Sequence, residues 1–179
     1  MELIEGLKTR RTIRSFNNKE IDIKVVEKII DLTRYQPTWK NTQIVRYYFT
    51  NDFKKINEIS ENIGHDWNKN IIKNSKGVMV LTYKTHISGY EKDGTPSTTK
   101  GSHFESFDCG VMAEAFVLSC YNYGIGTVIM GIFNEAKLKE VININPGEDI
   151  ACVIPMGYYD ELPEAPKKKE VSELLNILK

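Results

Sequence analysis

Three guanidinium groups occur within five residues in the stretch Arg10-Arg11-Thr12-Ile13-Arg14-Ser15-Phe16, and the rest of the chain can be organised around it. A guanidinium is a fixed fork of donors that matches phosphate oxygens two at a time, and it keeps its charge at any ordinary pH. In an extended chain, alternate residues point the same way, so Arg10, Thr12 and Arg14 would share one face. The stretch therefore predicts a cradle for a phosphate and for a second anionic or carbonyl-rich group of the same ligand. The alternative interpretation is a solvated basic surface near a terminus.

The composition limits the classes of protein to consider. The chain has 179 residues, of which 41% are hydrophobic, and this is enough for one domain with a sizeable core. Lys+Arg and Asp+Glu both number 24, so the zero net charge argues against a nucleic-acid or membrane-surface protein. No apolar run approaches the roughly 20 residues that span a bilayer. The acidic start, Met1-Glu2-Leu3-Ile4-Glu5, is unlike a signal peptide, so we expect a cytoplasmic protein.

The three cysteines predict neither a disulfide framework nor a metal site. Cys109 and Cys120 fall on one expected helix, about 16 Å apart at about 1.5 Å per residue, which is too far for a disulfide. Cys152 lies in an apolar, strand-like run, and the sequence has no C-x-x-C or H-x-x-x-H spacing. We therefore expect all three cysteines to be small buried hydrophobes and expect no protein metal site.

Hydrophobic periodicity predicts alternating helices and strands. Helices are expected over residues 2–9, 23–35, 53–63, 66–73, 105–123 and 135–142, and strands over 44–50, 77–83, 126–131 and 150–157. Helix N-caps are expected at Asp22, at Asn51 or Asp52, and at Asn134, and Gly124 is placed as a C-terminal cap. The strand over 77–83 is almost continuously apolar, so it should be central and covered on both faces.

Two loops and one helix have compositions that indicate binding. Residues 36–43 form a polar loop with carboxamides, hydroxyls and an exposed-looking Trp39, which suits reading the edge of a planar heterocycle; the alternative is an ordinary helix-to-strand connection. Residues 84–103 are rich in Gly, Ser, Thr and Lys and predict a lid or binding loop, with simple disorder as the alternative. The helix over 105–123 is apolar almost all round, so it should be buried on most sides, most easily at a subunit interface.

Common catalytic signatures are absent from the sequence. It contains neither G-x-G-x-x-G nor G-x-x-x-x-G-K-[ST], and no G-x-S-x-G elbow. No carboxylate pair stands out as acid and base. Cationic groups lie near both ends of the chain, with a carboxamide-rich loop between them. This pattern predicts a cofactor that carries the reactive group itself, so that the protein has only to bind it and to stabilise its charge. We therefore nominate no catalytic residue.

An ordered set of motifs across essentially the whole chain resembles the nitroreductase family of FMN-dependent oxidoreductases. The motifs are Arg10-Arg11-Thr12-Ile13-Arg14-x-Phe16, Pro37-Thr38-x-x-Asn41-x-Gln43, Asp108-x-Gly110 and Tyr123-Gly124-Ile125-Gly126 leading to Met130-Gly131. The resemblance implies one FMN-binding domain over residues 1–179, with an α+β fold and a central mixed or antiparallel sheet flanked by helices. It also implies an intertwined homodimer in which both subunits build each of two flavin sites.

The same resemblance implies which residues hold the phosphate end of FMN. Arg10 and Thr12 would bind the phosphate, with Arg11 nearby. The chain ends in a proline-stiffened tail, residues 161–166, followed by three lysines. Lys167 and Lys169 would return to the phosphate, with a register that is open by one residue.

The ring of the flavin would be held by three other groups of residues. Arg14 would lie at its pyrimidine edge, beside N1 and O2, where a fixed cation stabilises the negative charge of the reduced ring. A second group would approach from the other subunit: Pro37, Thr38, Trp39 and Asn41. A third would run along the dimethylbenzene-to-N5 side, where a backbone N–H can point at N5: Val128, Ile129, Met130 and Gly131.

The activity that the resemblance implies is ping-pong hydride transfer. NADH or NADPH would reduce the flavin at N5, and a nitroaromatic, a quinone or a similar electron-poor acceptor would then be reduced in the same pocket. Acceptor selectivity would fall to residues 84–103 and to the aromatic side chains Trp39, Trp67, Phe104 or Phe107. The alternatives are a flavin-holding or flavin-sensing protein of the same fold without significant turnover, and a small anion- or RNA-binding module.

Some positions depart from the family pattern and leave the choice of acceptor open. Thr12 and Thr38 stand where serine is common, which keeps the hydroxyl. The usual Q-P-W after the asparagine is here Gln43-Ile44-Val45, and Met130 replaces an acidic residue found in many members.

Overall fold

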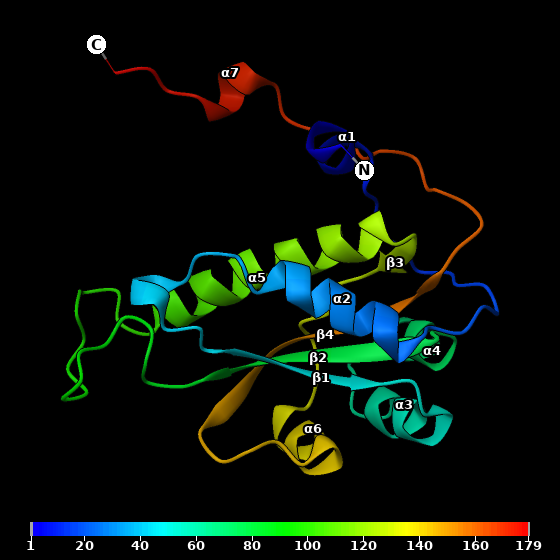
Figure 1. Ribbon diagram of the computed structural model, residues 1–179, viewed down its shortest axis with the longest axis horizontal. Helices are drawn as coiled ribbons and strands as arrows, with labels where there is room; N and C mark the ends of the chain where they lie inside the picture. Colours follow the sequence, from blue (N-terminus) through cyan, green and yellow to red (C-terminus); the bar gives the residue numbers. More distant parts are fainter. Residues whose placement is uncertain (1, 179) are drawn as a thin grey trace.

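A computed structural model describes residues 2–178 and shows an α+β fold around one antiparallel sheet. The strand order is β1-β2-β4-β3, formed by β1 (Val45–Thr50), β2 (Gly77–Lys84), β3 (Ile125–Thr127) and β4 (Glu148–Tyr158). In Figure 1, α2 (Ile23–Thr33) and α5 (His103–Asn122) lie on one side of the sheet, and α3 (Phe53–Ser60), α4 (Asp66–Lys73) and α6 (Glu135–Ile142) lie on the other. The predicted fold class is confirmed.

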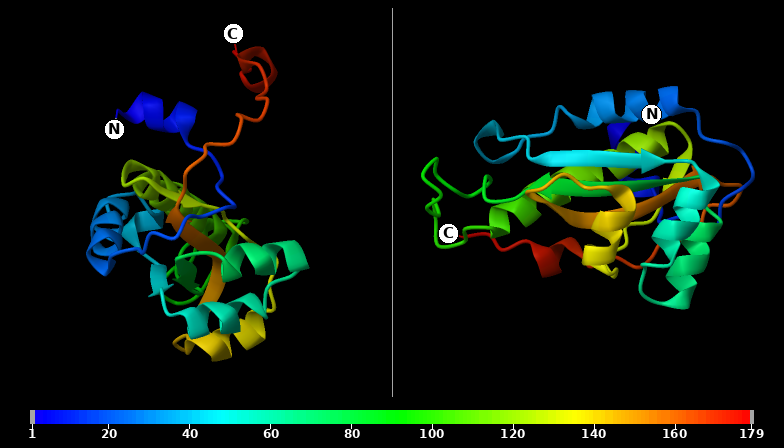
Figure 2. Two further views of the ribbon diagram at one scale, coloured as in Figure 1. Left: turned by 90° about the vertical axis from the view of Figure 1, so that its right-hand side faces the viewer. Right: turned by 90° about the horizontal axis from the view of Figure 1, so that it is seen from below.

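The ends of the chain leave these layers. Figures 1 and 2 show α1 (Leu3–Thr9) and α7 (Val171–Leu174) on the same side of the molecule, beyond α5. The segment that enters the body after α1 and the segment that leaves it after β4 pass each other at one end of the sheet. Within residues 2–178, no helix combines the length and apolarity needed to cross a membrane.

The sheet separates two hydrophobic cores, and β2 contributes to both. Met79 and Leu81 pack on the α2/α5 side, whereas Val78 and Val80 pack on the α3/α4/α6 side, and all four are at most 1% exposed. Alternate residues of a strand point to opposite faces, so a strand that is apolar at every position must be covered twice. The prediction that this strand is central is confirmed.

Most expected helix ends are also confirmed. Asp22 accepts a hydrogen bond from the Lys24 N–H and Asn134 accepts one from the Lys137 N–H, as N-caps do. Asp52, rather than Asn51, caps α3 through the Lys55 N–H. Gly124 follows α5 with a φ of 71°, a conformation that glycine adopts without penalty. The three cysteines are buried, as predicted.

The strand expected over residues 126–131 is shorter than predicted, because β3 ends at Thr127. The chain continues beside β4, where the Val128 N–H donates to the Pro155 carbonyl and the Met130 N–H donates to the Val153 carbonyl. Proline has no N–H to return, so Pro155 interrupts a regular ladder at this point. Residues 128–131 are therefore extended but belong to no regular strand.

The arginine stretch lies along β3 and is seated on two glycines. The Ile13 N–H donates to the Thr127 carbonyl at 2.9 Å, and the Ile13 side chain is only 3% exposed. A Cβ on Gly126 would come within 2.5 Å of Ile13, and one on Gly157 would come within 2.9 Å of Phe16. The missing side chains let residues 10–16 lie flat against the sheet, which fixes the positions of the arginines on either side of Ile13.

We expect Gly126→Ala to destabilise the fold by about 1–3 kcal/mol, because its methyl group overlaps Ile13 and the arginine stretch must lift from the sheet. Urea denaturation measures this loss. Gly131→Ala is the matched control, since no atom lies within 4 Å of a Cβ built there. Equal stabilities of the two variants would contradict the seating of Ile13 on Gly126.

Candidate functional site

The arginine stretch and the C-terminal tail together line a cavity of about 410 Å³, called here the arginine cavity. Arg10, Thr12 and Arg14 line it from one side. The tail supplies the other side with Pro163, Glu164, Ala165, Pro166 and Lys168. The structure thus brings the two basic segments of the sequence, more than 150 positions apart, to one place.

The three guanidiniums of the arginine cavity are not equivalent. Arg11 donates from Nη1 to the carbonyls of Lys8 and Arg10 at 2.9 and 3.0 Å, so it caps the C-terminal end of α1. Arg10 lies 3.8 Å from the exposed carboxylate of Glu114 on α5, a distance that gives a weak ion pair. Arg14 forms no ion pair within the described residues. Arg10 and Arg14 therefore remain available to an anionic ligand.

The structure places one of the three tail lysines at the arginine cavity, within the one-residue range that the sequence left open. Lys168 lines the cavity, whereas Lys167 and Lys169 do not, and all three residues are exposed. An extended tail alternates its side chains, so one of three successive lysines faces the cavity while its neighbours face away. Sequence alone could not choose between these registers, because all three residues are identical.

A second cavity of about 450 Å³, called here the tryptophan cavity, adjoins the first. It shares Thr12, Arg14 and Pro163 with the arginine cavity, and it is also lined by Trp67, a residue of the first turn of α4 that is 67% exposed. The Gly64 N–H donates to the Ile132 carbonyl at 2.9 Å, and this bond fixes α4 beside the end of the 128–131 segment. Among the four aromatic residues considered from sequence, Trp67 is the one beside Arg14.

The 128–131 segment turns alternate residues in opposite directions. Val128 and Met130 are buried, and their N–H groups are used by β4. Ile129 and Gly131 are exposed. Among the residues that the structure describes, the N–H groups of Ile129 and Gly131 have no hydrogen-bond partner and can meet a ligand, whereas the Met130 N–H donates to Val153.

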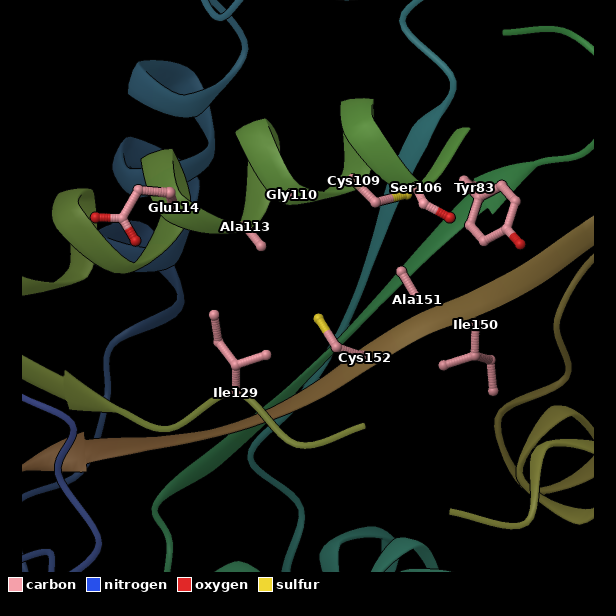
Figure 3. A pocket seen from close by; sticks show the side chains of 10 residues that line it. All are labelled: Tyr83, Ser106, Cys109, Gly110, Ala113, Glu114, Ile129, Ile150, Ala151 and Cys152. Atoms are coloured by element: carbon pink, nitrogen blue, oxygen red, sulfur yellow. The ribbon is translucent and has the colours of Figure 1, made fainter. Parts of the chain in front are cut away.

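Ile129 also closes one end of a slot of about 390 Å³ between α5 and β4 (Figure 3). Ser106, Cys109, Gly110, Ala113 and Glu114 line it from α5, and Tyr83, Ile150, Ala151 and Cys152 line it from the sheet. Burial is the main cause that raises the pKa of Cys109 to about 12 and that of Cys152 to about 12. Besides the polar side chains of Ser106, Tyr83 and Glu114, the slot is lined by neutral thiols and apolar groups, and this apolar part suits the face of a flat ring.

The polar loop over 36–43 lies at the other end of α5 and lines neither the arginine nor the tryptophan cavity. It includes the short 3₁₀ helix η1 (Trp39–Asn41). The prediction of an exposed Trp39 is wrong in part, because its ring packs 4.0 Å from the Phe104 ring and its Nε1 is buried without a partner in the described residues. Pro37 and Asn41 are exposed and Thr38 is half-buried.

The arrangement suits an elongated ligand with an anionic end and a flat polar ring. The guanidiniums, the ammonium of Lys168 and the carboxylate of Glu164 line the arginine cavity, and Arg14 stands at its junction with the tryptophan cavity. The separate slot between α5 and the sheet is lined in part by small residues. Within residues 2–178, no group of three or more His, Cys, Asp or Glu side chains could hold a metal ion. The site therefore offers charged groups and hydrogen-bond donors that can bind such a ligand and stabilise its negative charge.

The chain matches known proteins over most of its length. The profile described as Nitroreductase family matches residues 7–158. A protein of Archaeoglobus fulgidus with the provisional name NADH dehydrogenase/NAD(P)H nitroreductase is 22% identical over 161 residues, which cover 88% of this chain and 85% of that protein.

Solved structures share the fold. The nitroreductase family protein of Streptococcus pneumoniae TIGR4 superposes with a TM-score of 0.86 at 20% identity, over 98% of this chain and 99% of that one. The NADPH:FMN oxidoreductase of Vibrio harveyi, solved with NAD⁺, gives a TM-score of 0.81 at 19% identity, over 97% of this chain and 75% of that one.

We expect the thiols of the slot to be unreactive in the folded protein. With their pKa values raised to about 12, Cys109 and Cys152 stay protonated at pH 8, and only a thiolate attacks a disulfide reagent. Labelling with a chromogenic aromatic disulfide at pH 8 should be slower by a factor of about 1,000 than in urea, where the pKa returns to about 8.5. Rapid labelling of Cys152 in folded protein would show that the slot opens to solvent.

Proposed function

Since the chain belongs to the nitroreductase family, we propose that it is an FMN-dependent oxidoreductase that takes electrons from NADH or NADPH and reduces a nitroaromatic, a quinone or a similar electron-poor acceptor. One observation carries the proposal: Arg10, Arg14 and Lys168 converge on one cavity that continues into a second cavity walled by an aromatic ring. The name of the Vibrio harveyi relative, an NADPH:FMN oxidoreductase, supports the choice of cofactor and donor.

The residues present fit FMN in their chemistry. A phosphate monoester needs charged donors and a hydroxyl, and the arginine cavity offers Arg10, Thr12 and Lys168. The carbonyl-bearing edge of the ring needs a cation, and Arg14 lines both cavities. A flat ring needs apolar walls without bulky projections, and Gly131, which would meet no atom through an added Cβ, leaves the backbone open there. When bound, FMN would accept a hydride at N5 and pass the electrons to an acceptor.

Each residue of the chain then has a limited task. Arg10, Thr12 and Lys168 hold the phosphate, while Arg11 keeps α1 in place behind them. Arg14 supplies a permanent positive charge beside the ring, which favours the electron-rich state. We assign no general base, because protons can come from solvent.

We further propose a homodimer, because one subunit leaves the site incomplete. Pro37, Thr38, Trp39 and Asn41 do not line the arginine or tryptophan cavity of their own chain, so they can serve a flavin only in a second copy. The outer face of α5 offers a groove of about 810 Å³ lined by Leu32, Phe107, Val111, Leu118 and others. Exposed apolar residues also occur on α1 and in the tail. A second copy would cover all of these surfaces.

We expect Arg14→Ala to weaken FMN binding or slow flavin reduction by about 10- to 100-fold, because a charge-assisted hydrogen bond to the ring is lost. Fluorescence titration of apo protein with FMN and single-turnover reduction by NADH or NADPH measure the two effects. Arg34→Ala is the control, since this guanidinium pairs with Asp31 on the surface.

Two outcomes would separate the hypotheses for the wild-type protein. Protein that stays colourless after reconstitution with FMN would contradict the proposed function. Yellow protein that oxidises NADH and NADPH with p-benzoquinone no faster than free FMN would favour the flavin-holding alternative.

We expect Lys168→Ala to weaken FMN binding by about three- to fivefold at low salt, because an exposed charge facing a phosphate contributes modestly and is screened by ions. Lys167→Ala and Lys169→Ala are matched controls on the same exposed tail, and both should stay within about twofold of wild type. Isothermal titration at two salt concentrations measures the difference. A larger effect at Lys167 or Lys169 would mean that the tail shifts by one residue around the bound phosphate.

A further inference from the structure

A buried carboxylate on α5 holds two separate loops. Asp108 is 1% exposed, and both of its carboxylate oxygens accept the Trp39 N–H, at 3.0 and 3.1 Å. Its Oδ2 also accepts the Ser88 hydroxyl at 2.6 Å, and Ser88 is fully buried. No Lys, Arg or His forms an ion pair with Asp108 within the described residues. A carboxylate that is buried without a cation is costly, so its two neutral partners must satisfy it.

The first of these loops, residues 37–43, needs an external anchor. Lys40, Asn41 and Gln43 adopt φ values of 43°, 56° and 49°, in the left-handed region that residues other than glycine rarely occupy. Such conformations persist only where surrounding contacts over-determine them. Inside the loop, the Thr38 hydroxyl accepts the Gln43 N–H. From outside, two polar contacts hold the backbone: the Trp39 N–H donates to Asp108, and Arg46 Nη1 donates to the Gln43 carbonyl at 2.9 Å. The contact with Asp108 is the one that comes from α5.

The second loop, residues 85–102, is tied to the first at two points. Ser88 reaches Asp108 in the interior, and at the surface Lys40 pairs with Glu91 at 2.8 Å. Glu91 also accepts the Ser97 hydroxyl at 2.6 Å, which carries the connection across the loop. Figure 1 shows the two loops together at one end of the molecule, beside the start of α5. The alternative of simple disorder therefore does not describe this structure, whereas the expected lid or binding function of the loop stays a prediction.

We propose that Asp108 is a positioning residue that makes residues 37–43 and residues 85–102 one mechanical unit. This inference rests on the proposed function, in which the first loop meets the flavin of a second copy, and on the expectation from the sequence that residues 84–103 select the acceptor. Asp108 then sets flavin retention and acceptor binding together, although it touches neither ligand. The chemistry is simple: one carboxylate has two acceptor oxygens, so it can serve a backbone donor and a hydroxyl donor at once.

Neighbouring residues supply matched variants. Asp108→Ala removes both links, and Ser88→Ala removes only the link to residues 85–102. Asp108→Asn should restore most of the geometry, because its carbonyl oxygen can accept the Trp39 N–H while its amide donates to the Ser88 hydroxyl. If Asp108→Ala fails to fold, Asp108→Leu replaces it, because its side chain branches at Cγ as aspartate does, fills the space and offers no acceptor to either donor.

The decisive measurement needs no flavin. In hydrogen–deuterium exchange of the apo protein, Asp108→Ala should speed exchange about tenfold in both loops and leave β2 unchanged. Ser88→Ala should speed exchange in residues 85–102 only, and Asp108→Asn should resemble wild type. Faster exchange in only one loop of Asp108→Ala, or an equal increase throughout β2, would overturn the inference.

Measurements with FMN and an acceptor then test the second part of the inference, that Asp108 affects the binding of both ligands. In holoenzyme assays with NADH and p-benzoquinone, Asp108→Ala should raise both the Kd for FMN and the KM for quinone about tenfold, whereas Ser88→Ala should raise the KM alone. A raised KM with an unchanged Kd in Asp108→Ala would overturn the coupling. Wild-type protein that binds no FMN would instead refute the proposed function and leave the exchange result standing, so the two failures are distinguishable.

Discussion

The structure depends on one steric contact, in which the Ile13 side chain rests on the bare backbone of Gly126. This contact and the hydrogen bond from the Ile13 N–H to Thr127 bring the arginine stretch to the sheet as an added edge. Phe16 on Gly157 repeats the arrangement three residues later. Because Ile13 points inward, its neighbours Thr12 and Arg14 must point outward, so a packing constraint decides where the charges lie.

Helix α5 joins this basic end to the loop end of the molecule. Toward its C-terminus, Glu114 approaches Arg10 and the Tyr121 hydroxyl donates to Thr9 at 2.9 Å. Toward its N-terminus, Glu105 accepts the His86 N–H and Asp108 accepts the Trp39 N–H. One helix of 20 residues, about 30 Å long, thus fixes both halves of the candidate site. In the proposed dimer, each half would be completed by the opposite half of the second copy.

Local patterns in the sequence predicted much of the fold. The caps at Asp22 and Asn134 depend on neighbouring residues only, and the double burial of β2 follows from an unbroken apolar run. The end of β3 was missed because it depends on Pro155, a proline in another strand. The partial burial of Trp39 was missed for a similar reason, since its partner Phe104 is 65 positions away.

In the candidate site, too, local residue types could be predicted from the sequence, whereas contacts between distant residues could not. The residue types in the arginine stretch indicated an anion, but nothing local could show that Trp67 would stand beside Arg14 or that Lys168 would be the inward lysine. The sequence showed Asp108 as part of a motif. Its proposed positioning role could be inferred only from the structure, in which two donors from distant loops meet at its carboxylate. Only tertiary packing decides which of several identical residues faces a site and which widely separated residues come into contact.

The two ends of the chain have a consequence for handling the protein. Leu3, Ile4 and Leu7 on α1 and Val171, Leu174 and Ile177 in the tail are all more than half exposed, and they extend from the same side of the body (Figure 2). Burying these side chains against a neighbouring molecule would therefore add to the stability of the fold. If the protein forms the proposed dimer, its melting temperature would rise with the protein concentration, and dilution would lower the stability of the fold.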